Sequence, residues 1–198
     1  MSYDLTHPAD TLAWMRQDAL ARLIPFAALV TGTWLRRQPP WLGVSGGRTR
    51  TQAAFGAAAG VTLFGTSALL QRSLSRRRGT LRAPSSMSDA LVQAGYYAVN
   101  GPIEEAFFRG LLQGGVGSRL GTPAGLVAGT VPYVLYHRLG GWPWPEVAAT
   151  ALAGVPLGLA YRLLPGRPSL LGVSLAHIGA TCGFMGPGPW LLRKVGLV

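Results

Sequence analysis

Acidic side chains and cysteines are scarce in this sequence. Seven Asp and Glu residues stand against 18 Lys and Arg residues, which gives a formal net charge of +11. The single cysteine, Cys182, excludes an intrachain disulfide framework and is expected to be a small packing residue. Internal repeats and breaks in composition are also lacking, so we expect one membrane domain spanning residues 1–198.

Charged residues are missing altogether from residues 53–70 (AAFGAAAGVTLFGTSALL). At roughly 1.5 Å per residue, this run is about as long as the hydrocarbon core of a bilayer requires. Further long apolar blocks follow, without the short alternating runs of a soluble sheet protein. The pattern predicts an all-α, polytopic transmembrane helical bundle of about six helices, with spans at 23–35, 53–70, 90–116, 121–136, 147–164 and 170–185.

The segments between the apolar blocks contain most of the arginines. Residues 36–50 and 71–86 are rich in Arg, and anionic lipid headgroups are the simplest partner for such clusters in a membrane protein. We therefore expect membrane lipids as partners and no nucleic acid. Residues 1–22 are expected to form an N-terminal tail or an interfacial helix, since 11–24 could lie on the membrane surface before the first span.

Small residues recur at four-residue spacing within the apolar blocks. This spacing lets helices approach each other closely in lipid, so it predicts a tightly packed bundle. The pairs are Gly56 and Gly60, Gly110 and Gly114, Gly125 and Gly129, Gly154 and Gly158, and Gly179 and Gly183.

Two of the few acidic residues, Glu104 and Glu105, are adjacent within an otherwise apolar block. Each uncompensated charge in a membrane span costs roughly 3 kcal/mol, so this placement needs a reason. Glu105 and Arg109 are four residues apart and can pair on one helical face. Glu104 is rotated by about 100° from that pair and has no obvious partner in its own helix. Glu104 is thus the candidate general base, and the alternative is that both glutamates only pair with arginines between helices.

Two of the three histidines, His137 and His177, lie at the end or in the interior of apolar blocks. Tyr133 precedes His137 by four residues, and Thr181 follows His177 by one helical turn, so each pair shares a helical face. Taken singly, each histidine fits a hydrogen-bonded packing residue. Combined with the glutamate pair, they predict a polar site shared by three helices.

The spacing of these residues defines three ordered motifs. Residues 104–109 (EEAFFR) match EExxxR, residues 133–137 match aromatic-xxx-His, and residues 177–181 are similar to His-xxx-Asn/Asp. In this order, on three successive apolar segments, they resemble the CPBP family of intramembrane proteases. That family is also called the Abi or CAAX-protease and bacteriocin-processing family, and it includes the Rce1 type. The resemblance covers about residues 90–185.

The resemblance implies a helical membrane core that cleaves a peptide or protein substrate near the membrane surface. It implies that Glu104 activates water with help from His137, and that His177 and Thr181 stabilise the oxyanion. The supporting residues would be Glu105, Arg109 and Tyr133. We expect an integral membrane protein of a bacterial-type cytoplasmic membrane.

The sequence departs from the family pattern at Tyr133, where Phe is frequent, and at Thr181, where Asn or Asp is usual. A tyrosine preserves the ring. A threonine offers one rotatable donor on a shorter stem, and losing one oxyanion donor typically costs roughly 100- to 1000-fold in rate. The alternative to a working peptidase is therefore a catalytically weak or inactive scaffold, immunity or regulatory protein with the family fold.

Two other functions compete with these. A glutamate and two histidines could hold zinc with one position open for water, but the HExxH spacing of soluble zinc proteases is absent, so we expect no cofactor. A transporter or channel could use the buried charges as an ion path. Six short helices without an internal repeat suit that function poorly.

Overall fold

The computed structural model describes residues 8–44, 48–78, 81–163 and 168–197, and every regular element within these ranges is helical. The predicted all-α bundle is confirmed. In chain order, the helices are α1 (Pro8–Asp18), η1 (Ala19–Leu23), α2 (Ile24–Arg37), η2 (Pro40–Leu42), α3 (Thr49–Arg78), α4 (Met87–Glu105), η3 (Ala106–Gly114), α5 (Gly115–Leu120), α6 (Thr122–Leu139), α7 (Trp144–Leu163), α8 (Leu170–Phe184) and α9 (Pro187–Lys194). Here η1 and η3 are π-helical and η2 is a single 3₁₀ turn.

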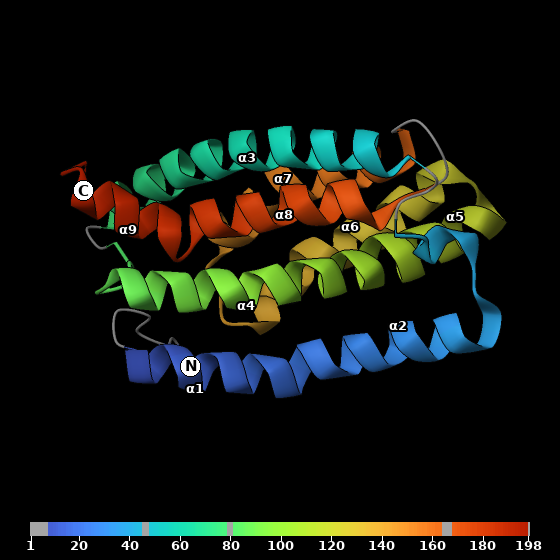
Figure 1. The fold of residues 1–198 in the computed structure, drawn as a ribbon, viewed down its shortest axis with the longest axis horizontal. Helices are drawn as coiled ribbons and strands as arrows, with labels where there is room; N and C mark the ends of the chain where they lie inside the picture. The colour runs from blue at the N-terminus through green and yellow to red at the C-terminus, as the bar shows by residue number, and fades with distance from the viewer. Residues whose placement is uncertain (1–7, 45–47, 79–80, 164–167, 198) are drawn as a thin grey trace.

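The N-terminal segment differs from the predicted surface helix. Helices α1, η1 and α2 form one helix, in which Asp10–Arg37 is long and apolar enough to cross a membrane (Figure 1). The π-helical turn of η1 connects the two α-helices, and Pro25, the second residue of α2, lies directly after it. The residues expected to lie on the surface are thus the beginning of the first candidate span.

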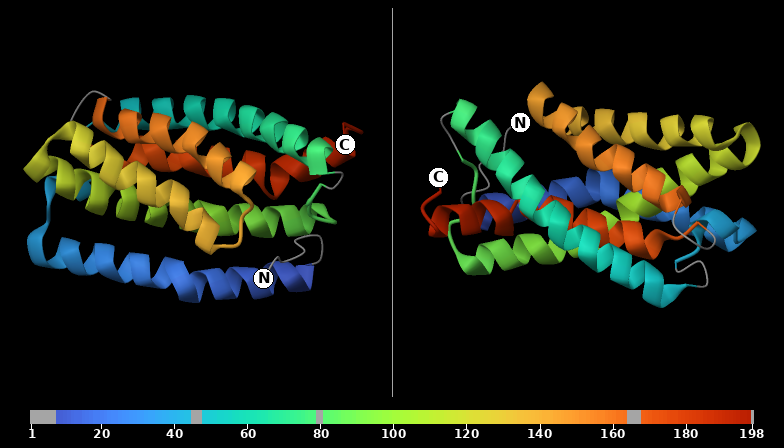
Figure 2. Two further views of the ribbon diagram at one scale, coloured as in Figure 1. Left: turned by 180° about the vertical axis from the view of Figure 1, so that it is seen from behind. Right: turned by 90° about the horizontal axis from the view of Figure 1, so that it is seen from above.

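The remaining helices pack side by side along the long axis of the molecule (Figure 1). Helix α3 packs mainly against α8 and crosses it obliquely, while α6 packs against α7 and η3 (Figure 2). Helix α4 lies between the N-terminal helix and α8. This arrangement places α4 with η3, α6 and α8, which contain the three sequence motifs, around a common interior.

The contact between α3 and α8 depends on the predicted small residues. A Cβ atom at Gly179 would collide with the backbone of Gly60, and one at Gly183 would collide with the backbone of Phe64. Glycines therefore allow the two helix backbones to touch, as the four-residue spacing predicted.

The distribution of polarity is inverted relative to a soluble protein. Gln93, Glu105 and Arg109 are fully buried, and Glu104 is 4% exposed. Large apolar side chains point outward instead, as expected when the surroundings are lipid. Examples are Leu20, Leu29, Val61, Leu69, Leu91, Val99, Leu135 and Leu152.

Length and apolar character alone identify fewer spans than the sequence blocks suggested. Asp10–Arg37 and Thr49–Arg77 each qualify, and α8 with α9, which are bent by 42°, make a third if they count as one span. Helices α4 and α6 are not among them. All six predicted blocks are nevertheless helical where the structure describes them, apart from the end residues Gly121 and Met185.

Candidate active site

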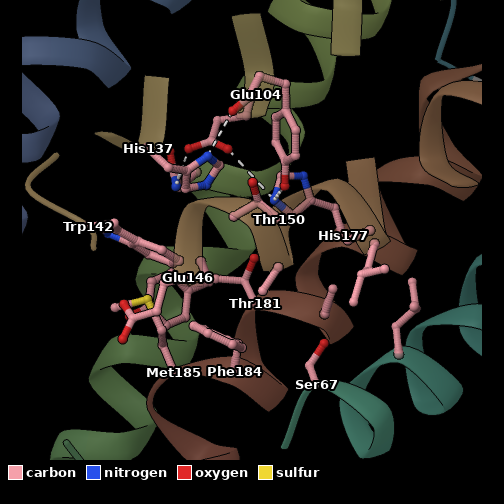
Figure 3. A pocket seen from close by; sticks show the side chains of 18 of the residues that line it. Ser67, Glu104, His137, Trp142, Glu146, Thr150, His177, Thr181, Phe184 and Met185 are labelled. Carbon is pink, nitrogen blue, oxygen red and sulfur yellow. Dashed lines mark hydrogen bonds and ion pairs between the residues drawn. The ribbon is translucent and has the colours of Figure 1, made fainter. Parts of the chain in front are cut away.

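A cavity of about 220 Å³ lies among α1, α3, α4, α6, α7 and α8 (Figure 3). Its wall includes all four residues predicted to be catalytic, Glu104, His137, His177 and Thr181, together with Tyr133. Glu105 and Arg109 do not line it. The structure therefore brings the three motifs together around one space.

Glu104 is held at one carboxylate oxygen by two donors. Its Oε1 accepts a hydrogen bond from Asn100 Nδ2 at 2.9 Å and another from the hydroxyl of Tyr136. Its Oε2 lies 3.7 Å from Nε2 of His177. The expectation that Glu104 has no partner in its own helix is wrong, because Asn100 lies one turn earlier on α4. These donors fix the carboxylate and leave Oε2 directed toward the histidine.

Glu105 lies behind the cavity wall and connects His177 to Arg109. Its Oε1 accepts a hydrogen bond from Nδ1 of His177 at 2.7 Å, and its Oε2 is 3.3 Å from Nε of Arg109. Arg109 also donates from Nη1 to Thr130 Oγ1 at 3.2 Å. The predicted pair of Glu105 and Arg109 is confirmed, and it is fully buried.

His137 has its ring oriented by the backbone of its own helix. Its Nδ1 lies 2.8 Å from the carbonyl oxygen of Tyr133, so Nδ1 carries the proton and donates it. The other nitrogen, Nε2, is then an acceptor. The rings of His137 and Tyr136 meet edge to face with centroids 4.3 Å apart.

Tyr133 links the two histidine motifs. Its hydroxyl lies 3.4 Å from Nε2 of His177, and its ring packs against the guanidinium of Arg109 at 4.9 Å from the centroid. Thr181 lies one turn beyond His177 on α8 and is half-buried in the cavity wall (Figure 3). Tyr133 of the second motif and Thr181 of the third motif therefore both lie in the wall of the cavity.

Three residues at the site were missed from the sequence. Asn100 and Tyr136 donate to Glu104, and Arg22 of the N-terminal helix lines the cavity. Asn100 could have been found, because it lies four residues before Glu104 and faces the same way. Tyr136 and Arg22 come from other helices, and no helical periodicity connects them to Glu104.

The polar side chains do not form a metal site within the described ranges. No group of three or more His, Cys, Asp or Glu side chains there could hold a metal ion. Each histidine also uses Nδ1 in a hydrogen bond to the protein, His137 to a backbone carbonyl and His177 to Glu105.

Comparison with known protein families gives one match. The family model of the type II CAAX prenyl endopeptidase Rce1-like proteins matches residues 86–182. The segment 86–182 is thus similar to the Rce1-like family. The predicted resemblance is thereby confirmed. No curated protein and no solved structure matches the chain.

The Rce1-like segment contains α4, η3, α5, α6, α7 and most of α8. It therefore includes all the motif residues around the cavity. The match supports a function of the CAAX-protease type in general terms, and the apolar helices indicate an integral membrane protein. Helices α1, η1, α2 and α3 precede the Rce1-like segment.

Proposed function

We propose that this protein is an intramembrane endopeptidase in which Glu104 activates a water molecule to hydrolyse a peptide bond near the membrane surface. One observation supports this most strongly: the carboxylate of Glu104 is fixed through Oε1, while Oε2 is directed toward His177 in a cavity that His137 also lines. A general base needs this combination of fixed geometry and a free basic atom.

In the first step, Oε2 of Glu104 takes a proton from water, and the water oxygen forms a bond to the scissile carbonyl carbon. His137 Nε2 accepts a hydrogen bond from the other O–H of the water, which orients the attacking lone pair; Nε2 is free to accept because Nδ1 already donates to the Tyr133 carbonyl. The carbonyl electron pair moves onto oxygen and forms a tetrahedral oxyanion. When the C–N bond breaks, the leaving amine takes the proton from Glu104, which regenerates the carboxylate.

The oxyanion requires donors that are already in place. His177 supplies one from Nε2 when its ring is an imidazolium, a form that Glu105 favours by accepting from Nδ1. Thr181 supplies the second through its hydroxyl. Arg109 and Tyr133 act behind these groups, since Arg109 holds Glu105 and contacts the Tyr133 ring. No step requires a metal.

The substrate in this proposal is a membrane-bound peptide, of the prenylated CAAX type or a short precursor peptide. The other partners are membrane lipids, and nucleic acid is not one of them. The location is a bacterial-type cytoplasmic membrane, where the arginine-rich segments contact anionic headgroups.

The decisive experiment uses the purified full chain in liposomes and an internally quenched, prenylated CAAX peptide, called the CAAX probe below. Glu104→Gln and His137→Ala are each expected to lower the cleavage rate by roughly 100-fold or more while the protein stays folded. Glu146→Gln is the matched control, because it removes another carboxylate that lines the same cavity. Wild-type cleavage by both Glu104→Gln and His137→Ala would overturn the proposal.

One observation favours a second candidate function. Thr181 provides a shorter and rotatable donor in place of the Asn or Asp that is usual in the family. A regulatory or scaffold protein with weak or no activity would tolerate this change. In that case, a cellular phenotype of the protein would persist in Glu104→Gln.

A further inference from the structure

The N-terminal helix supplies a cation to the cavity from outside the Rce1-like segment. Arg22, in the π-helical turn η1, lines the cavity, whereas the family match begins at residue 86. Its side chain is 20% exposed, so it can be reached from the cavity. A π-helical turn changes the direction of side chains relative to an α-helix and is frequent at functional sites.

Arg22 is held by a buried acid. Asp18, one turn earlier, pairs with Arg22 through Oδ1 and accepts a hydrogen bond from the hydroxyl of Tyr96 through Oδ2. Only 3% of the Asp18 side chain is exposed. Tyr96 lies on α4, one turn before Asn100, so this acid ties the N-terminal helix to the helix that contains Glu104.

Aromatic contacts fix the N-terminal helix on both sides of Arg22. Trp14 meets Tyr96 edge to face with ring centroids 5.5 Å apart. Phe26 stacks on Phe107 with centroids 4.0 Å apart. The helix is therefore docked along its length, and the position of Arg22 is defined by packing.

The guanidinium of Arg22 covers the ring of Tyr136, at 5.0 Å from the ring centroid. Tyr136 contacts both groups proposed to activate water: its hydroxyl donates to Glu104 Oε1, and its ring meets that of His137. Holding this ring in place thus fixes the direction of the Glu104 carboxylate and one side of the His137 ring.

We propose that Arg22 is a positioning residue of the active site, which acts through Tyr136 on Glu104 and His137. The N-terminal helix is then part of the catalytic unit, although it lies outside the Rce1-like segment. This inference rests on the proposed function, since it assigns Arg22 to the same hydrolytic site. A misplacement of a reacting group by about 1 Å can cost roughly 100-fold in rate, so a group that acts only through another still has a measurable effect.

The test compares Arg22→Ala with Arg16→Ala, which removes an exposed arginine of the same helix. With the CAAX probe, Arg22→Ala is expected to lower kcat by roughly 10- to 100-fold with KM unchanged within about two-fold. Arg16→Ala should behave as wild type. Guanidinium ion, added well below denaturing concentrations, should restore part of the activity of Arg22→Ala, because the side chain it replaces is accessible from the cavity.

Wild-type kcat in folded Arg22→Ala would overturn the inference, as would a loss of activity in the folded variant that guanidinium does not reverse. If Arg22→Ala does not fold, Arg22→Gln, which keeps part of the stem and removes the charge, takes its place under the same criteria. Glu104→Gln is measured in parallel. Full activity of Glu104→Gln overturns the proposed function and this inference with it, whereas full activity of the Arg22 variant alone overturns only the inference.

Discussion

His177 donates from Nδ1 to Oε1 of Glu105 across 2.7 Å, and this contact connects the cavity wall to a buried ion pair. The other oxygen of Glu105 is 3.3 Å from Nε of Arg109, and all three side chains are at most 4% exposed. The second glutamate of the pair therefore orients a histidine that faces the first glutamate. Glu104 is thus held by Asn100 and Tyr136 in the cavity wall, while Glu105 contacts His177 and Arg109 behind it.

The buried pair should contribute more to stability than to the chemical step. Arg109→Leu leaves Glu105 with His177 alone, and Glu105→Leu leaves Arg109 buried without its carboxylate, so each change is expected to cost roughly 3–5 kcal/mol in the free energy of unfolding. The double variant Glu105→Leu with Arg109→Leu should recover a large part of this loss, because neither member of the ion pair is then left buried without the other. Equilibrium unfolding in mixed detergent measures all four corners of the cycle. Additive losses in the double variant would contradict the coupling.

Thr181 is the position where a substitution should raise activity. Thr181→Asn introduces the amide donor that the family usually has, on a longer stem, and is expected to increase kcat for the CAAX probe by roughly 10-fold or more. Thr181→Val, which has the same shape without the hydroxyl, should lower kcat further. If neither variant changes the rate, Thr181 does not contact the oxyanion.

The contact of α3 with α8 predicts a large difference between two glycines. Gly179→Ala places a methyl group against the backbone of Gly60 and is expected to destabilise the protein by about 1–3 kcal/mol. Gly65→Ala is the control, because a Cβ atom at Gly65 meets nothing within 4 Å. Thermal unfolding in detergent should show a lower Tm for Gly179→Ala only. Equal melting temperatures would show that α3 and α8 can shift to accept the added methyl group without a loss of stability.

Periodicity and motif spacing predicted the parts of this fold that depend on a single helix. The apolar blocks, the small-residue contact of α3 with α8, and the pair of Glu105 with Arg109 all follow from which residues share a helical face. The convergence of the three motifs on one cavity was predicted from the residue types and from the resemblance to a family, because spacing along three separate helices carries no distance between them.

The parts that were missed depend on how helices are placed relative to one another. The donor from Tyr136 to Glu104 and the position of Arg22 over the Tyr136 ring both join different helices. The sequence predicts a surface helix over 11–24 and a first span over 23–35, whereas Asp10–Arg37 is one helix with charged side chains in its first half. In the folded chain Asp18 and Arg22 neutralise each other, so these charges do not end the helix.

Tyr136 contributes to the site in two ways: its hydroxyl holds Glu104, and its ring is covered by Arg22. A single substitution can separate these two contributions. Tyr136→Phe removes the hydroxyl that donates to Glu104 Oε1 but keeps the ring that Arg22 covers. We expect kcat to fall by roughly 10-fold, because Asn100 then holds the carboxylate alone. Combining Tyr136→Phe with Arg22→Ala should cost less than the sum of the two effects, because the part of the Arg22 effect that reaches Glu104 passes through this hydroxyl.

The matched control for Tyr136→Phe is Tyr161→Phe. Tyr161 is also buried, but its hydroxyl donates to the carbonyl of Trp41 at 2.5 Å and does not line the cavity. Loss of that hydrogen bond is expected to lower the free energy of unfolding by about 1 kcal/mol and to leave kcat unchanged. Steady-state cleavage of the CAAX probe and thermal unfolding of both variants separate the two effects. If Tyr136→Phe changes only the stability, as expected for Tyr161→Phe, its hydroxyl is a packing feature and Glu104 is oriented by Asn100.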